Sequence, residues 1–296
     1  MSAALPDWNS AIQPEQGKTE FSIKSIVLPL DDNQASRTAL PVAHTFAELY
    51  RCALRVLYVG KEQLDIRHAA SQLGLAAEQA QGAIFEQHCG APDDAVTPLR
   101  DSSEGLLVMS TTVGSQEADN RFGFLTESFL AAKPQRAILV NSNAGYKRWS
   151  LRRILLAHDG TPISNPAVAA AADLARRAGA EVIALHVAAR GEERPEARGS
   201  IAAPLYVDQA HHEWPAWAEE FMNRVVASGA LGSGVHFKLK VTGGQAGSEL
   251  AGVAHECNVD LVIMAWHGHW TEHENCATRV VIRNAGCPVM LVYSAS

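Results

Sequence analysis

Two aspartates stand at matching points of the chain, each directly after a buried strand. Asp31 follows the apolar run SIVLPL (25–30) and Asp159 follows RILLAH (153–158), which places the two 128 positions apart. A carboxylate at the end of a strand can accept hydrogen bonds from a base or a sugar. The same residue type also suits a helix N-cap or a turn without any ligand. The repetition of the aspartate at matching positions strengthens the case for ligand binding. Both ligand binding and a structural role as a cap or turn residue stay open.

Two loops that follow later strands could complete such a binding site. They span 110–113 after the apolar run LLVM (106–109), and 265–268 at the end of LVIMA (261–265). A loop of small residues that leads into a helix can hold phosphate with its backbone N–H groups. In open parallel sheets, ligands bind outside the carboxyl ends of the strands, where the strand order reverses. We therefore expect each aspartate and its loop to lie at one edge of a sheet.

Three histidines could bind a metal ion. His267, His269 and His273 lie on the loop after the run 261–265, and three imidazoles can share Zn²⁺ with a fourth ligand. Residues of suitable type for the fourth position are His211, Glu213 and Cys276. The spacing matches no standard zinc motif, so solvated loop histidines are the competing interpretation. Such a cluster could also make the loop sensitive to pH near neutrality.

Strands and helices alternate along the chain, and this order positions the residues above. Buried apolar runs predict strands at 25–30, 54–59, 84–89, 106–109 and 137–140, and again at 153–158, 182–187, 235–241, 261–265 and 289–292. Helices are expected at about 35–52, 62–81, 126–132, 165–179, 215–230 and 248–256, with Asn165 as the cap of the fourth. The alternation indicates βαβ units with right-handed crossovers. The predicted fold is α/β, with two doubly wound five-stranded parallel-sheet domains.

The two halves of the chain keep the same register. Asp31 to Asp159 and Val59 to Val187 are both shifts of 128, and by the fifth strand the shift is 152. Strands that hold register while insertions and deletions fall between them are typical of two domains with one fold. The predicted organisation is a flexible tail (1–22), a first domain (23–141), a linker (142–151) and a second domain (152–296).

Composition limits the classes of function. The net charge of −7 argues against nucleic acid or an anionic membrane as the main partner. Five cysteines without a CxxC pair indicate buried thiols in a reducing compartment. No apolar run is long enough for a membrane helix, and the first residues lack the pattern of a signal peptide. These features predict a cytoplasmic protein without membrane or nucleic-acid partners.

Three segments of the second half resemble the universal stress protein family. They are LLAHDGTPIS (155–164), VTGGQAGSELAGVAHECNVDLVIM (241–264) and CPVMLV (287–292). The whole chain resembles a tandem member, with one domain over about 23–141 and another over 152–293. The resemblance implies an adenine nucleotide alpha hydrolase-like fold. It also implies that the fifth strands of the two halves pair as an internal pseudo-dimer, and it leaves a homodimer of the chain open.

Family members that bind ATP carry a glycine pattern after the fourth strand. The pattern is Gly, two residues, Gly, nine residues, and then Gly-Ser or Gly-Thr. By resemblance it falls on Ser110, Val113, Gly123 and Phe124 in the first half, with the spacing intact. Val113 replaces a glycine that lets the backbone approach phosphate, and Phe124 replaces the hydroxyl.

The second half departs from the family pattern in another way. There the pattern falls on Ala265, Gly268, Asn275 and Cys276, with six residues where the family has nine. The resemblance makes the strand-one aspartates base contacts, and the further cofactor-binding residues are Val59, Val187 and Met264. Each half thus keeps the aspartate and alters the phosphate cradle, so ATP, AMP or another small molecule are the candidate ligands.

Together these features predict a stress-response protein that binds ligands and regulates partners, not a dedicated enzyme. Its adenine-nucleotide sites are expected to be degenerate, and ligand binding is expected to stabilise the pair of domains. One alternative is a weak ATPase or a zinc-binding activity centred on the histidine-rich loop. A second alternative is a protein-interaction module without a ligand.

Overall fold

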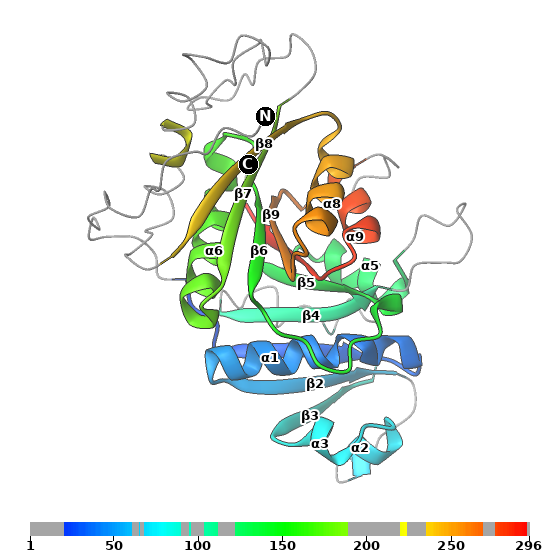
Figure 1. The fold of residues 1–296 in the computed structure, drawn as a ribbon. Helices are drawn as coiled ribbons and strands as arrows, with labels where there is room; N and C mark the ends of the chain where they lie inside the picture. The colour runs from blue at the N-terminus through cyan, green and yellow to red at the C-terminus, as the bar shows by residue number, and fades with distance from the viewer. Residues whose placement is uncertain are drawn as a thin grey trace.

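The strands form one continuous sheet. The computed structural model describes residues 21–60, 65, 68–89, 95, 104–111, 122–188, 220–223, 235–268 and 276–294. Within this part, a 10-stranded sheet has the order β3-β2-β1-β4-β5-β10-β9-β6-β7-β8 (Figure 1). Neighbouring strands are parallel except β5 and β10, which are antiparallel. The predicted α/β class with a mostly parallel sheet is confirmed.

The first half carries the strands β1 (Ser25–Leu30), β2 (Ala53–Val59), β3 (Ala83–His88), β4 (Gly105–Thr111) and β5 (Arg136–Asn141). Its helices are η2 (Gln34–Ala39), α1 (Leu40–Tyr50), α2 (Ala69–Gln72), α3 (Ala77–Ala80) and α5 (Phe124–Ala131). Every strand predicted for this half is present, with ends that differ by at most two residues.

The second half carries the strands β6 (Arg153–Ala157), β7 (Glu181–Ala188), β8 (Phe237–Gly243), β9 (Leu261–Trp266) and β10 (Val289–Tyr293). Its helices are η5 (Pro162–Ser164), α6 (Asn165–Ala178), α8 (Ala246–Glu256) and α9 (Ala277–Asn284), and the turn η4 (Ser142–Ala144) precedes it. Residues 220–223 are helical, and the rest of the helix predicted at 215–230 lies outside the described residues. Of the helices that the structure describes, none has the length and apolar character needed to cross a membrane.

One helix prediction was wrong in the first half. The described part of the segment 62–81 holds two short helices, α2 and α3, where a single long helix was expected. The first ends because Gly74 adopts a left-handed conformation (φ +64°), and the N–H of Leu75 turns back to the C=O of Ala70 (2.8 Å). A glycine in this conformation is a common helix stop.

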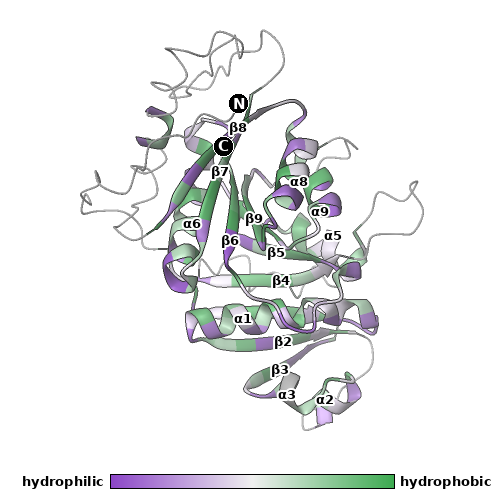
Figure 2. Cartoon of the chain, viewed as in Figure 1, coloured by the Kyte–Doolittle hydropathy of each residue, from purple (hydrophilic) through white to green (hydrophobic). Residues whose placement is uncertain are grey.

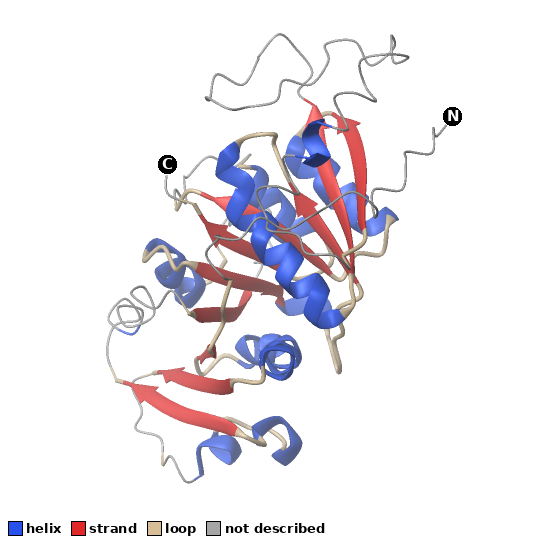
Figure 3. Ribbon diagram, turned by 90° about the vertical axis from the view of Figure 1, so that its left-hand side faces the viewer, coloured by secondary structure: helices blue, strands red, loops and turns tan. Residues whose placement is uncertain are grey.

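Helices cover both faces of the sheet (Figure 3), and two cores result. One core lies under α1 and α6 and includes Leu28 and Leu156, whereas the other lies under α5, α8 and α9 and includes Val27 and Leu155. Successive side chains of a strand point to opposite faces, so a strand that is covered twice is apolar along its length. Figure 2 shows this pattern as largely hydrophobic strands beside helices of mixed character.

The strands β5 and β10 join the two halves. Met290 lies opposite Ile138, and Val289 lies opposite Leu139, with all four residues buried. Two apolar strands that would otherwise be open sheet edges cover each other in this way. On each side of the junction the strands follow one order, β3-β2-β1-β4-β5 in the first half and β8-β7-β6-β9-β10 in the second.

The segment predicted as a linker packs against both halves. The ring of Trp149 stacks on Phe46 of α1 with 5.6 Å between centroids, and its C=O accepts a hydrogen bond from the hydroxyl of Thr45 (2.9 Å). Tyr146 donates its hydroxyl to the C=O of Gly286 in the second half (3.3 Å). This segment is therefore held in place from both sides.

Candidate functional site

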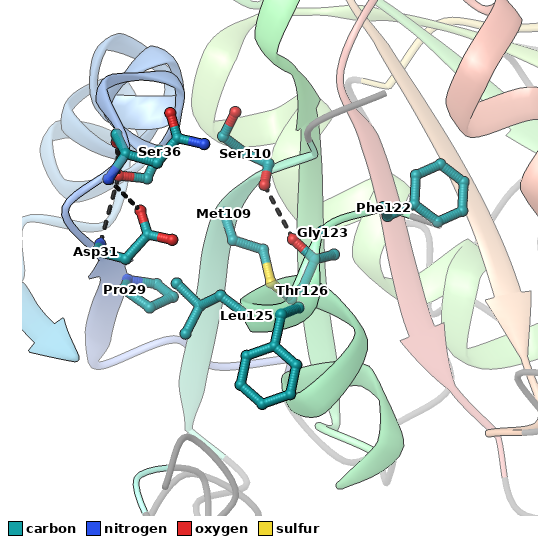
Figure 4. A pocket seen from close by; sticks show the side chains of 11 residues that line it. Pro29, Asp31, Ser36, Met109, Ser110, Phe122, Gly123, Leu125 and Thr126 are labelled. Atoms are coloured by element: carbon teal, nitrogen blue, oxygen red, sulfur yellow. Dashed lines mark hydrogen bonds between the residues drawn. The ribbon is translucent and has the colours of Figure 1, made fainter. Parts of the chain in front are cut away.

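A pocket opens at the carboxyl ends of β1 and β4 (Figure 4). These strands are neighbours, and the strand order of the first half reverses between them, which is where ligands bind in such sheets. The pocket has a volume of ≈ 140 Å³ and is lined by Pro29, Asp31, Asn33, Ser36, Met109, Ser110, Phe122, Gly123, Phe124, Leu125 and Thr126. It brings together Asp31, Ser110 and Gly123 from the predicted site. Val59 is buried in the core instead, and Val113 lies outside the described residues.

Asp31 begins a tight turn at the end of β1. Its Oδ1 accepts a hydrogen bond from the N–H of Asn33 (3.1 Å), and its own N–H donates to Oγ of Ser36 (3.4 Å). Asn33 is the N-cap of η2, where its Oδ1 accepts from the N–H of Ala35 (3.0 Å). The turn fixes Asp31 in the pocket wall, and its second carboxylate oxygen has no hydrogen-bond partner among the described residues.

The hydroxyl groups that line the pocket all donate their hydrogen bonds to other groups of the protein. Ser36 and Thr126 donate to backbone carbonyls at 2.7 and 3.0 Å, respectively. Thr38 donates to the C=O of Ala35 (2.8 Å), so Ser110 is the donor in the 2.6 Å contact between the two hydroxyl oxygens of Thr38 and Ser110. The lining hydroxyls therefore offer a ligand acceptors and not donors.

The N-terminus of α5 lies at this pocket, and a carboxylate already compensates its positive dipole. Glu127 stands in the first turn of α5, and its Oε1 accepts a hydrogen bond from the N–H of Phe122 (3.1 Å). Nη1 of Arg279 in α9 lies 3.8 Å from Oε1 of Glu127. Cζ of the same guanidinium group lies 5.5 Å from the ring centroid of Phe122. A residue of the second half thus holds the segment that leads into the pocket of the first half.

Asp159 forms the corresponding turn at the end of β6. Its Oδ1 accepts hydrogen bonds from the N–H of Thr161 (2.9 Å), the hydroxyl of Thr161 (2.7 Å) and the hydroxyl of Ser164 (2.7 Å). Partial burial acts to raise the pKa of Asp159, but these hydrogen bonds outweigh burial and lower it. Ser164 occupies the N-cap position of α6, so the prediction that Asn165 caps this helix was wrong by one residue. The hydroxyl of Ser164 donates to Asp159 and not to the backbone of the helix. In both halves the aspartate is a turn residue.

The other residues predicted for the second-half site lie on several elements. Val187 of β7 and Ala265 of β9 are half-buried near the carboxyl ends of the strands that flank β6. Met264 is buried in the core under α8 and α9. Cys276 is half-buried at the N-cap position of α9, and Asn275 lies outside the described residues. The strand ends converge as predicted, whereas the role of this site stays a prediction.

Gly268 lies where the second half meets the first. It is buried and left-handed (φ +69°), and a Cβ atom there would come within 2.8 Å of Cδ of Lys133 and 2.9 Å of Cε2 of Tyr293. Lys133 belongs to the turn between α5 and β5 of the first half. Backbone conformation and close packing therefore both require a glycine here, apart from any phosphate.

Gly268→Ala is expected to lower the free energy of unfolding by about 1–2 kcal/mol, because an L residue is strained at this φ. Chemical denaturation of the purified chain measures the difference. Gly252→Ala is the matched control, since Gly252 lies within α8 with nothing within 4 Å of an added Cβ. That control is expected to raise stability by about 0.5–1 kcal/mol. Equal effects of the two substitutions would contradict the packing described for Gly268.

The predicted metal site has no support within the described residues. No group of three metal-ligating side chains is found among them. His267 is exposed, and its Nδ1 lies 3.4 Å from the C=O of Ser294. His269 and His273 lie outside the described residues.

Two buried histidines that the sequence analysis did not single out lie beside Asp159. They are His158 and His186 of β7, and the ring of Phe221 packs on both, with centroids 5.0 and 5.4 Å away. The N–H of Gly160 donates to Nδ1 of His158 (3.0 Å), which places the ring proton on Nε2. Burial lowers the pKa of His158 to about 4 and also lowers that of His186. The available sequence signal was a histidine near the end of each apolar run, RILLAH and VIALHV.

Residues 150–293 match the model of the universal stress protein family. One domain of this family is therefore present in the second half, and the resemblance noted there is confirmed. A comparison with curated protein sequences finds no match.

Solved structures share the fold over nearly the whole chain. A functionally unknown protein from Pseudomonas aeruginosa PAO1 has a TM-score of 0.60 at 13% identity and covers 93% of this chain and 94% of its own. A universal stress protein from Archaeoglobus fulgidus DSM 4304 has a TM-score of 0.61 at 15% identity, with 91% and 98% covered. A universal stress protein in complex with cAMP covers 49% of this chain and 99% of its own, at 19% identity and a TM-score of 0.36. The first two similarities extend across both halves of the sheet.

Proposed function

We propose that the chain is a regulatory binding protein made of two universal stress protein-like halves that form an internal pseudo-dimer. The family match of the second half supports a role in stress response. The repeated strand order supports a second domain of the same kind in the first half. The antiparallel pairing of β5 with β10 supports their association as a pseudo-dimer.

The pocket between β1 and β4 carries the proposal of ligand binding. Asp31, Ser110 and Gly123 come from separate parts of the chain and line one pocket at the point where the strand order reverses. Among the described residues, the hydroxyl of Ser110 bonds to Thr38 and not to a histidine or a carboxylate, so none of them is placed as a general base that would activate it as a nucleophile. The arrangement favours binding over catalysis.

The turn at Asp159 supports a second, related ligand site in the second half. It keeps a carboxylate at the end of β6, within the segment that matches the family. We infer degenerate adenine-nucleotide sites in which the base pocket persists, with ATP or AMP as the ligands to test first. The contact between Arg279 and Glu127 gives a route by which a ligand would stabilise the pair of halves.

Thermal unfolding of the purified chain with ATP, AMP, adenosine or Zn²⁺ tests this function. A ligand that binds the folded state stabilises it by RT ln(1 + [L]/Kd), so the midpoint of unfolding rises with ligand concentration. We expect a rise with at least one of the adenine compounds. The rise is expected to be lost in Asp31→Ala or in Asp159→Ala, depending on the half that binds.

Each other outcome selects a different function. A rise with Zn²⁺ that is lost in His269→Ala would favour the zinc-binding alternative. An unchanged midpoint with all four compounds would overturn ligand regulation by adenine compounds and favour an interaction module. For the adenine compounds, His267→Ala serves as a control, because His267 is exposed and its replacement leaves both aspartates untouched. It is not a control for Zn²⁺, since His267 is one of the candidate ligands.

A further inference from the structure

We propose that Arg279 of the second half is a positioning residue for the pocket of the first half, because it holds one wall of that pocket in place. The inference rests on the proposed function, since it takes the pocket between β1 and β4 to be a ligand site. It adds a residue from the other half that sets how well this site binds. Three features carry it: the build of the wall, its contacts with α9, and the different use of one matching position in α5 and α9.

One continuous segment forms a wall of the pocket. Residues 122–126 supply five of the eleven lining residues, and Asp31 stands on the other side (Figure 4). The N–H of Phe122 donates to Oε1 of Glu127 (3.1 Å), and the N–H of Glu127 donates to the C=O of Gly123 (3.0 Å). The position of Glu127 therefore sets the position of this wall relative to Asp31.

Two arginines of α9 contact the same segment. Cζ of Arg279 lies 5.5 Å from the ring centroid of Phe122, and Cζ of Arg283 lies 5.3 Å from it, both within the range of a cation–π contact. Nη1 of Arg279 also lies 3.8 Å from Oε1 of Glu127, the oxygen that accepts from Phe122. In Figure 4 the ring of Phe122 points away from Asp31. The second half thus holds the wall from the side that faces away from the ligand.

Burial strengthens the contacts of Arg279. Its side chain is 10% exposed and that of Glu127 is 25% exposed, while Phe122 is 1% exposed. Opposite charges attract each other more strongly where water is largely excluded, and a cation–π contact also gains when the cation is desolvated. Arg283 is half-buried, so its cation is better hydrated. We therefore expect Arg279 to make the larger contribution of the two arginines.

The matching position of the first half has another use. The helix α5 follows β4 and α9 follows β9, and their third residues are Thr126 and Arg279. Thr126 donates to a backbone carbonyl of β4 in its own half (3.0 Å). Arg279 instead reaches Glu127 of the other half, whereas Val280, the fourth residue of α9, packs on Gly247 of α8. Among the described residues, the contact therefore runs from the second half to the pocket of the first and is not repeated in reverse.

Hydrogen exchange of the full chain, followed by mass spectrometry, tests the hold on the wall without any ligand. Arg279→Met keeps a long side chain and removes the charge. It is expected to speed exchange in peptides that span 122–131 by about three- to tenfold, because the wall opens more often. Arg279→Lys keeps the charge but loses the planar group that stacks on Phe122, so its exchange is expected to fall between the two.

Arg177→Met is the matched control. Arg177 also joins a carboxylate and an aromatic ring at the junction of the halves, since it bonds to Asp173 and lies 4.5 Å from the ring centroid of Tyr50. Tyr50 belongs to the core on the opposite face of the sheet from Phe122. The control removes a similar contact between the halves and is expected to leave exchange at 122–131 unchanged.

Calorimetric titration with adenosine, AMP and ATP then measures the effect on binding. For a compound whose binding is lost in Asp31→Ala, Arg279→Met is expected to raise Kd by about three- to tenfold. Arg177→Met is expected to leave this Kd unchanged. A purely structural role of Arg279 would lower stability in both arginine variants and would leave both Kd values as they are.

The outcomes separate this inference from the proposed function. Exchange at 122–131 that stays unchanged in Arg279→Met, or that rises equally in Arg177→Met, would overturn the inference. An unchanged Kd in Arg279→Met, for a compound that binds through Asp31, would overturn it as well. A chain that binds none of the three compounds would overturn the proposed function, and faster exchange in Arg279→Met alone would still support the hold of Arg279 on the wall.

Discussion

Replacing Asp173 with alanine is expected to lower the free energy of unfolding by about 2–4 kcal/mol. Asp173 lies on α6 of the second half, is 8% exposed, and accepts hydrogen bonds from the hydroxyl of Tyr50 (2.7 Å) and from Nε of Arg177 (2.9 Å). Tyr50 belongs to α1 of the first half, so this cluster ties the halves together on one face of the sheet. Without Asp173, a buried phenol loses its acceptor, which is the larger part of the cost because Arg177 is partly exposed.

Denaturation in urea, followed by circular dichroism, measures this loss. Burial, and then the charge of Asp173, raise the pKa of Tyr50, so its hydroxyl stays protonated and donates throughout the neutral range. Adding Tyr50→Phe to Asp173→Ala removes the orphaned hydroxyl and is expected to recover part of the stability. Arg176→Ala is the control on the same helix, because Arg176 is exposed. If Asp173→Ala cost no more than Arg176→Ala, the cluster would not hold the halves together.

The strands could be predicted because both faces of the sheet are covered. A strand such as SIVLPL is apolar at successive positions only where side chains on both faces are buried, and Val27 and Leu28 do enter different cores. The meeting of Asp31 with Ser110 followed from the same prediction. Once β1 and β4 are neighbours in a parallel sheet, the residues after them share one edge.

The helix stop at Gly74 was missed although its signal is local, because a left-handed glycine is a common helix stop. Other features depend on contacts between distant segments that no local pattern predicts. Asp173 interrupts an alanine-rich face of α6, and its partner Tyr50 lies 123 positions away. Arg279 reaches Glu127 and Phe122 across the junction of the halves. Each of these contacts joins segments whose proximity follows from the complete fold.

The histidine pair beside Asp159 was missed for a similar reason. In RILLAH, a histidine at the end of a strand resembles a surface residue that follows a buried run. The ring of Phe221, from a distant segment, encloses His158 and turns that position into core. Burial of an ionisable ring has a consequence for stability that can be measured.

Stability is expected to fall by about 3 kcal/mol as the pH drops from about 6.5 to 4, through His158 alone. Burial lowers the pKa of this ring to about 4, against its ordinary value of 6.5. The folded state therefore binds fewer protons than the unfolded state between these values. The stabilisation is complete above pH 6.5 and is lost as the pH falls toward 4. Protonation of Nδ1 would also break the hydrogen bond from the N–H of Gly160.

Two charged or titratable neighbours, Asp159 and His186, also act on the pKa of His158. Asp159 acts to raise the pKa of His158 and His186 acts to lower it, both by less than burial does. Denaturation at stepped pH, with His158→Asn, isolates the contribution, because asparagine can still accept from the N–H of Gly160 but does not titrate. The variant is expected to lose most of the pH dependence between 4 and 6.5, and adding His186→Asn is expected to reduce it further. His267→Asn changes an exposed ring and is expected to leave the dependence unchanged. A slope that is the same in His158→Asn and in the parent chain would show that folding does not lower the pKa of His158, contrary to the burial of its ring.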